Sequence, residues 1–218
     1  MPPPDLPSEA PSSDASAPVP PGRKRPKPGE RRAQILQALA TMLEQPGAER
    51  ITTAALAARL GVSEAALYRH FASKAQMFEA LIDFIESTVF GLVNQIADRE
   101  PAGSGRAARV VTMVLQFAEK NPGMTRVMVG DALVFENERL QQRMNQLFDK
   151  LEAALRQGLR DAALPDGQGG DSATPTADAQ LTASVLTSFM VGRLQRFARS
   201  GFRRSPTESL DAALTKML

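Results

Sequence analysis

The sequence predicts an all-α protein in which a small N-terminal helix-turn-helix head precedes a larger helical body. Apolar residues recur at spacings of three and four along most of the chain. No segment alternates apolar and polar residues as a half-buried strand would. Prolines fall between the periodic segments, where they end or start helices. We therefore expect a proline-rich tail over residues 1–29, a head over 30–76 and a body over 77–218.

Length and composition are those of a globular protein. The chain has 218 residues, of which 43% are hydrophobic and 23% charged, so it can form one large or two small domains. The net charge is only +2, so any affinity for nucleic acid must come from local clusters of basic residues. Cysteine is absent, which excludes disulfides, thiolate catalysis and cysteine metal sites.

No targeting or membrane segment is evident. The N-terminus lacks the apolar core of a secretory signal. The stretch Leu181 to Val191, taken as the longest mostly apolar one, is interrupted by threonines and serines and is too short to span a bilayer. We expect a soluble, cytoplasmic protein.

The tail is expected to be disordered, because residues 1–29 hold ten of the sixteen prolines and no aromatic residue. Six positive charges cluster at its end against the single Glu30: Arg23, Lys24, Arg25, Lys27, Arg31 and Arg32. Such an arm can contact DNA phosphates or enter a minor groove. The alternative is a solvated basic linker.

The head is predicted to contain three helices and a tight turn. The first runs from about Glu30 to Gln45 and ends at Pro46-Gly47. Thr52 or Thr53 can cap the second, and Gly61 ends it with a left-handed backbone. Ser63 caps the third helix, whose Leu67 and Phe71 should point into the core.

The outward face of the third helix is suited to DNA. Two alanines leave room for close approach to base edges, and the residues that follow offer donors to phosphates. Ser73-Lys74 begins the next helix and forms a phosphate site. The candidate DNA-binding residues are Thr52, Thr53, Ser63, Glu64, Ala65, Ala66, Tyr68, Arg69, His70 and Lys74. An ordinary solvated surface helix is the alternative.

The body is predicted to be a bundle of long helices. They cover Ser73 to Asp98, Arg106 to Lys120, Met124 to Leu133, Glu136 to Ala162 and Thr176 to Ser200, followed by a short helix from Pro206 to Leu218. Loops are expected at 101–105 and 164–175. The first of these helices is long enough to join the head to the body.

The last two long helices are predicted to form a dimer interface. Leu181, Val185, Ser188 and Gly192 line one small-residue seam, while other apolar residues lie elsewhere on the same helix. Helices that are apolar on more than one side need a second partner, so we expect a two-fold, four-helix interface. The alternative is that both are core helices of a monomer.

The sequence offers little for catalysis. The single histidine, His70, lies on the predicted third helix of the head, which would contact DNA. Neither a phosphate-binding glycine loop nor a metal-ligand cluster occurs in the sequence. We therefore expect no enzyme, no metal and no cofactor. Asp131 could pair with Glu136 or Glu138, although such carboxylates usually form a solvated face. The stripe Arg193, Arg196, Arg199 and Arg203 could receive an acidic peptide, with a solvated face as the default interpretation.

The run Leu67-Tyr-Arg-His-Phe-Ala-Ser-Lys74, with Phe78 shortly after, resembles the TetR family of bacterial regulators. Ala72, where many members carry proline, is a minor departure. This resemblance implies a TetR-type fold over about residues 30–76, with a C-terminal regulatory and dimerisation body.

A closer likeness is to the nucleoid occlusion factors of that family. It extends through Glu64–Phe71, Asn121–Arg126 and Phe135–Phe148, and covers about residues 30–205. It implies a DNA-bound dimer that engages the C-terminal tail of the division protein FtsZ and blocks ring assembly over the nucleoid. By matching position, the partner groove would include Phe84, Lys120 and Asn121, although the pattern alone makes Phe84 equally well a core residue.

Two further functions remain open at this point. A ligand-responsive TetR-type repressor would have the same head and could enclose a ligand among its apolar helices. A helical adaptor that never binds nucleic acid is disfavoured by the head. The run 121–148 favours the division inhibitor, because a generic repressor has no reason to share it.

Overall fold

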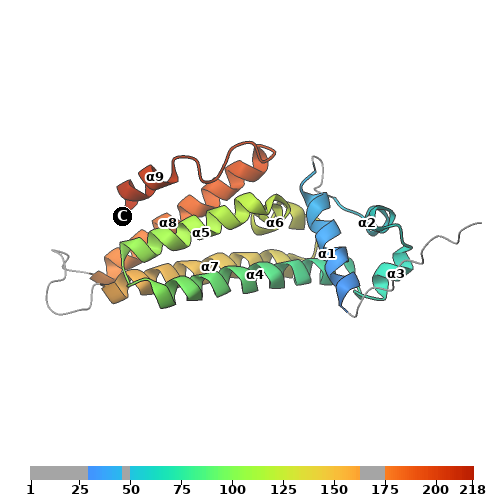
Figure 1. Ribbon diagram of the computed structural model, residues 1–218, viewed down its shortest axis with the longest axis horizontal. Coiled ribbons are helices and arrows are strands. Elements are labelled where there is room, and N and C mark those ends of the chain that lie inside the picture. Colours follow the sequence, from blue (N-terminus) through green and yellow to red (C-terminus); the bar gives the residue numbers. More distant parts are fainter. Residues whose placement is uncertain (1–28, 46–49, 163–174) are drawn as a thin grey trace, which may run out of the picture.

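The computed structural model describes residues 29–45, 50–162 and 175–218, and it is helical throughout these ranges without any strand (Figure 1). The basic cluster Arg23, Lys24, Arg25 and Lys27, the Pro46-Gly47 helix stop and most of the 164–175 loop lie outside the described residues. The molecule is elongated, with the small head at one end and the helices of the body stacked beyond it.

The head consists of α1 (Glu30–Leu43), α2 (Thr53–Leu60) and α3 (Glu64–Tyr68). Gly61 ends α2 with φ at 64°, in the left-handed region that glycine adopts at little steric cost. Leu67 and Phe71 are each only 1% exposed, which confirms that they point into the core. Val62 is half-buried against the same core.

Helix α4 (Lys74–Arg99) leaves the head and runs the length of the body. Ser73 caps it by accepting a hydrogen bond from the Gln76 N–H at 3.2 Å. By length and hydropathy alone α4 could cross a membrane, so its apolar stretch exceeds that of Leu181 to Val191. Met77, Ile82 and Val89 are fully buried inside the protein, and we therefore assign α4 as a core helix.

The body adds α5 (Ser104–Lys120), α6 (Pro122–Met128), the 3₁₀ turn η1 (Asp131–Leu133), α7 (Glu138–Ala162), α8 (Pro175–Arg199) and α9 (Leu210–Met217). Helix α5 runs back along α4 toward the head, whereas α7 runs away from it (Figure 1). Helices α7 and α8 make the most extensive pairing in the body. The buried α7 residues are Leu140, Met144, Leu147, Leu151 and Leu155, at the predicted helical spacing.

Three features of the helices differ from the prediction. The expected helix over 124–133 is broken, because Gly130 takes φ at 85° and separates α6 from η1. The last helix begins at Leu210 rather than Pro206. Thr207 and Ser205 donate hydrogen bonds to Glu119 on α5, and Ser209 takes φ at 50°, so this segment is a loop. The 101–105 loop is also shorter than expected, since α5 starts at Ser104.

The head is joined to the body where α1 packs against α6. Gly123 lies so close to α1 that a Cβ atom there would stand 2.0 Å from the Ala40 carbonyl oxygen and 3.3 Å from the Leu43 Cβ. Only glycine therefore allows this approach of the two backbones. The joint makes the orientation of the head dependent on the body.

Candidate nucleic-acid interface and partner groove

The helix-turn-helix is held by side-chain caps at both of its helices. Thr52 accepts a hydrogen bond from the Ala55 N–H at 3.2 Å, and Ser63 accepts one from the Ala66 N–H at 3.3 Å. Both hydroxyls satisfy backbone donors that have no partner within the helix. Thr52 and Ser63, singled out as DNA-binding candidates, thus also fix the start of each helix.

A side-chain bond joins the two helices on the exposed side. The Thr53 hydroxyl donates to Glu64 Oε2 at 2.6 Å, although the two residues lie eleven positions apart. This bond orients the Glu64 carboxylate at the first turn of α3, where the positive end of the helix dipole stabilises it. A carboxylate held there can accept a hydrogen bond from a cytosine amino group.

Most of the remaining candidates face solvent. Ala65, Arg69 and His70 are exposed, and Tyr68 is 46% exposed despite being aromatic. Ala66, predicted to face outward with them, is instead half-buried. These residues lie on α3 and in the segment that follows it, in the head at one end of the molecule (Figure 1).

The end of α3 is tied to α1. Arg32 donates from Nη1 to the His70 carbonyl oxygen at 2.7 Å, and its guanidinium lies 4.0 Å from the centre of the Phe71 ring. Arg32, which the sequence analysis grouped with the basic residues of the tail, therefore helps to fix the end of α3 against α1.

Lys74 occupies a different environment from the other candidates. Its ammonium forms an ion pair with Glu136, which lies between η1 and α7, and only 25% of its side chain is exposed. It also lies 5.7 Å from the centre of the Phe78 ring. The Glu136 carboxylate is 10% exposed, so the expectation of a solvated acidic face is wrong at this residue.

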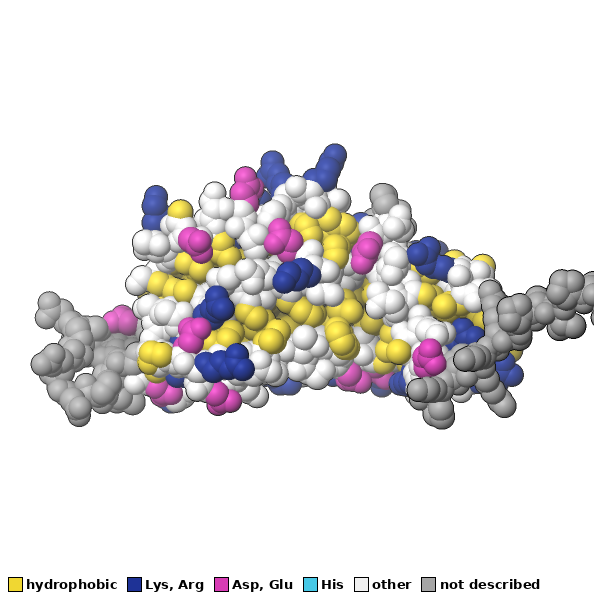
Figure 2. Space-filling model, viewed as in Figure 1, with side chains coloured by type: hydrophobic (Ala, Val, Ile, Leu, Met, Phe, Trp, Pro, Cys, Tyr) yellow, Lys and Arg dark blue, Asp and Glu magenta, His cyan; other side chains and the backbone are white. Residues whose placement is uncertain are grey.

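A groove of about 220 Å³ lies between α4 and α5. It is lined by Leu92, Gln95, Ile96, Arg99, Glu100, Arg109, Thr112, Met113 and Gln116. Figure 2 shows apolar surface along the strip between the two helices. Arg109 pairs with Glu100 at 3.6 Å, and Arg99 is exposed beside them. The groove therefore combines the apolar side chains of Leu92, Ile96 and Met113 with polar and charged ones.

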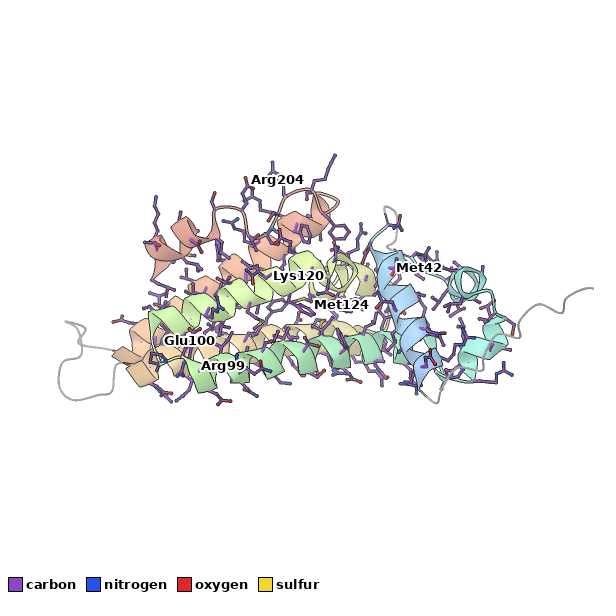
Figure 3. The ribbon with its side chains drawn as sticks, in the orientation of Figure 1. Met42, Arg99, Glu100, Lys120, Met124 and Arg204 are labelled. Carbon is purple, nitrogen blue, oxygen red and sulfur yellow. The ribbon has the colours of Figure 1, made fainter. Side chains whose placement is uncertain are left out.

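The three predicted partner-binding residues do not line this groove; they lie on the same two helices or directly after them, nearer the head. Phe84 is 47% exposed, so it is not the core residue that the pattern also allowed. It precedes Gln95 by eleven residues and lies on the same stripe of α4. Lys120 is exposed one turn after Gln116 on α5, and Figure 3 places it with Met124 near the head, far from Arg99 and Glu100. Asn121 is half-buried and donates to the Phe117 carbonyl oxygen at 2.7 Å, which leaves it mainly a cap.

The seam predicted for dimerisation is uncovered in the single chain. Leu181 is 66% exposed and Val185 is 46% exposed, and Ser188 and Gly192 continue the stripe along α8. Three residues of the arginine stripe, Arg193, Arg196 and Arg199, lie on the same helix, and Arg203 follows it. Arg193 donates to the Glu208 carbonyl oxygen at 2.7 Å, whereas Arg196, Arg199 and Arg203 are exposed.

The pattern in the sequence did not single out the residues that complete these surfaces. Met113, Gln116 and Arg109 line the groove, but on α5 they read as ordinary positions of an amphipathic helix. No local signal distinguishes an exposed groove residue from a core residue on a helix with this apolar content.

Two family models match this chain. One describes the bacterial regulatory proteins of the TetR family and matches residues 35–81. The other describes the tetracyclin repressor-like C-terminal domain of SlmA-like proteins and matches residues 104–217.

Close relatives are similar over nearly the whole chain. The nucleoid occlusion factor SlmA of Yersinia enterocolitica is 52% identical over 183 residues, which cover 84% of this chain and 90% of the relative. The protein of the same name from Photobacterium profundum is 51% identical over 186 residues, covering 85% and 92%.

Solved structures share the fold at low sequence identity. A TetR-like transcriptional regulator from a Rhodococcus species superposes with a TM-score of 0.67 at 18% identity, covering 88% of this chain and 97% of that one. The regulator FadR of Bacillus subtilis, solved with stearoyl-CoA, gives 0.61 at 14% identity, covering 85% and 96%. At such identities these structures show the fold alone.

Proposed function

The chain belongs to the SlmA nucleoid occlusion factors of the TetR family, and we propose that it binds specific chromosomal sites and, once bound, engages the C-terminal tail of FtsZ. This engagement would block assembly of the division ring over the nucleoid. The family is one of DNA-binding regulators rather than enzymes. The observation that carries the proposal is the presence, in one molecule, of an exposed helix-turn-helix and of a separate groove between α4, the helix that leaves it, and α5.

The DNA half of the proposal rests on the head. The caps at Thr52 and Ser63 and the bond from Thr53 to Glu64 hold a small-residue face toward the outside. We propose that the ten candidate residues contact DNA, with Ala65 and Glu64 near base edges and Tyr68, Arg69, His70 and Lys74 near phosphates.

The partner half rests on the groove between α4 and α5. Nearer the head, the exposed Phe84 on α4 offers an apolar contact, and Lys120 at the end of α5 supplies a positive charge. These features suit a peptide with apolar and acidic side chains, and we propose that the FtsZ tail lies there. Asn121 would contribute chiefly by ending α5 beside Lys120.

The uncovered seam on α8 supports a homodimer. We propose that Leu181, Val185, Ser188 and Gly192 meet their copies, with α7 and α8 of both protomers forming a four-helix interface. Two heads related by a two-fold axis would read a pseudo-palindromic site with half-sites about one helical turn, ~34 Å, apart. A protein so bound would be cytoplasmic and associated with the nucleoid.

The alternative function is a ligand-responsive repressor. One cavity favours it, since Val93, Val110 and Leu155 line a space of about 190 Å³ between α4, α5 and α7. Ligand pockets usually occupy ~300–1,000 Å³, so this cavity is small for the purpose. A small apolar compound that releases the duplex without any effect on FtsZ would favour the repressor.

Substitutions on α3 test the DNA half. Chromosomal fragments enriched on the immobilised protein are expected to share a pseudo-palindrome, from which a defined duplex follows. We expect Tyr68→Ala to weaken binding to that duplex by about fivefold to tenfold with an unchanged salt slope, because it removes a neutral contact. Arg69→Ala should weaken it similarly and also lower the slope by about one, because it removes a positive charge from a phosphate.

Fluorescence anisotropy between 50 and 200 mM salt, roughly the range over which phosphate contacts are resolved, measures both quantities. Arg160→Ala, at the distal end of α7, is the matched control and should behave like the parent. Unchanged affinity in both α3 variants would show that this surface does not read DNA.

A further inference from the structure

One connection of the body touches the head at two places. It spans residues 134–137, between η1 and α7. Phe135 is 65% exposed, and the Arg50 guanidinium, which precedes α2, lies 6.0 Å from the centre of its ring. The next residue, Glu136, pairs with Lys74 at the start of α4. The connection therefore contacts the head at both ends of the helix-turn-helix.

Glu136 is held in place by its own surroundings. Its N–H donates to the Leu133 carbonyl oxygen at 3.0 Å, which fixes the backbone after η1. The α7 helix that follows is tied to α4 by three more ion pairs, in which Arg139 contacts Glu79 and Arg143 contacts both Asp83, at 2.9 Å, and Glu86. The backbone that carries Glu136 is thus anchored to η1 on one side and, through α7, to α4 on the other.

The order of charges makes this alignment specific. In the pairs of Arg139 and Arg143, α4 supplies the acid and α7 the base. In the pair nearest the head the order is reversed, because α4 supplies Lys74 and the connection supplies Glu136. A slip of α4 by one turn would bring Glu79 toward Glu136, and a slip the other way would bring Lys74 toward Arg139. Like charges would meet in both cases, which disfavours either slip. Burial lowers the pKa of Arg143, but its hydrogen bonds to Asp83 and Glu86 outweigh this effect and raise it, so this pair stays charged.

Lys74 differs from Glu136 in its freedom to move. Its ammonium stands at the end of a flexible four-carbon chain and has three donors. A quarter of the side chain is exposed. A phosphate that received this ammonium at the start of α4 would also stand near the Glu136 carboxylate and be repelled by it.

We propose that Glu136 and a DNA phosphate compete for the Lys74 ammonium, so that binding to DNA breaks the ion pair between the head and the start of α7. This inference rests on the proposed contact of Lys74 with DNA. Glu136 acts as a positioning residue that holds Lys74 back in the free protein. DNA binding then loosens the connection that joins the head to α7, which gives the body a means of sensing the bound state.

A double-mutant cycle on a defined duplex tests the competition. We expect Glu136→Gln to tighten DNA binding by about threefold to tenfold, because the carboxylate no longer competes. Lys74→Gln should weaken binding, and adding Glu136→Gln to it should change the affinity by less than about twofold. Glu138→Gln removes the same charge two residues away, at an exposed position, and should resemble the parent.

If Glu136→Gln tightened DNA binding equally with and without Lys74, the effect would be one of general electrostatics and the competition would be overturned. The same conclusion would follow if Glu138→Gln tightened DNA binding as much as Glu136→Gln. Unchanged or weaker binding by Glu136→Gln would overturn it as well. Failure of the parent itself to bind any chromosomal fragment would instead refute the proposed function, and the inference with it.

A second measurement does not depend on DNA affinity. In the free protein, Lys74 should react with an amine-acylating reagent more slowly than the exposed Lys150, and Glu136→Gln should accelerate that reaction. Thermal unfolding of the variant confirms that it is folded. An identical rate of Lys74 acylation in parent and variant would show that the ion pair does not restrain the lysine.

Discussion

Gly123→Ala is expected to destabilise the protein by about 3 kcal/mol and to loosen the head from the body. The added Cβ would stand 2.0 Å from the Ala40 carbonyl oxygen and 2.9 Å from its carbonyl carbon. Both are backbone atoms inside α1 and cannot rotate away as a side chain could. The clash can be relieved only if α6 separates from α1, which opens the joint between the two domains.

Thermal unfolding measures the first effect, and a fall in Tm of roughly 10 °C is expected for a chain of this size. Gly158→Ala is the matched control, because its Cβ would meet only the Arg106 Cδ at 3.5 Å, an ordinary contact. That substitution should be neutral or slightly stabilising, since alanine is the better helix former. Equal stability of the two variants would show that the approach of α6 to α1 is not needed.

Phe84→Ala is expected to abolish most binding of the FtsZ tail while leaving DNA binding and folding intact. Phe84 is 47% exposed, so its loss leaves no internal cavity, whereas an aromatic anchor at an interface commonly contributes more than 2 kcal/mol. We therefore expect the affinity for a fluorescent tail peptide, measured with the duplex present, to fall at least about thirtyfold.

Lys120→Glu should weaken the same peptide through charge reversal at the end of α5. Lys216→Glu, at an exposed position on α9, makes the same change of charge away from the groove and serves as the control. Peptide binding that survives both Phe84→Ala and Lys120→Glu would place the partner on another surface.

Local features of the head could be predicted because short-range chemistry determines them. Thr52 and Ser63 cap the helices that follow them, and Gly61 takes the left-handed conformation expected of a helix end. Leu67 and Phe71 follow from a helical repeat and a single buried face.

Features that depend on distant residues could not be predicted in this way. The pair between Lys74 and Glu136 joins positions 62 apart, and the sequence alone suggested that the two residues were a phosphate contact and part of a solvated face. Likewise, Gly123 follows a proline and looks like a turn residue, but its role is set by the Ala40 backbone.

The exposure of Phe84 also depends on distant residues and could not be predicted from the helical pattern. On a helix with buried residues at most of its i, i+3 and i+4 positions, an apolar residue reads as core. Only the position of α5 decides that the Phe84 side of α4 is open. The family resemblance indicated the partner groove there, and the exposure of Phe84 is consistent with it.

The central claim is that one molecule couples a chromosomal site to a division protein. Sedimentation of FtsZ polymers with the protein, with and without its cognate duplex, tests this claim most directly. We expect the protein to pellet with FtsZ and to alter the amount of polymer when the duplex is present, and to do so far less with a scrambled duplex of equal length. A DNA-bound protein that neither pellets with FtsZ nor changes its polymers would contradict the claim.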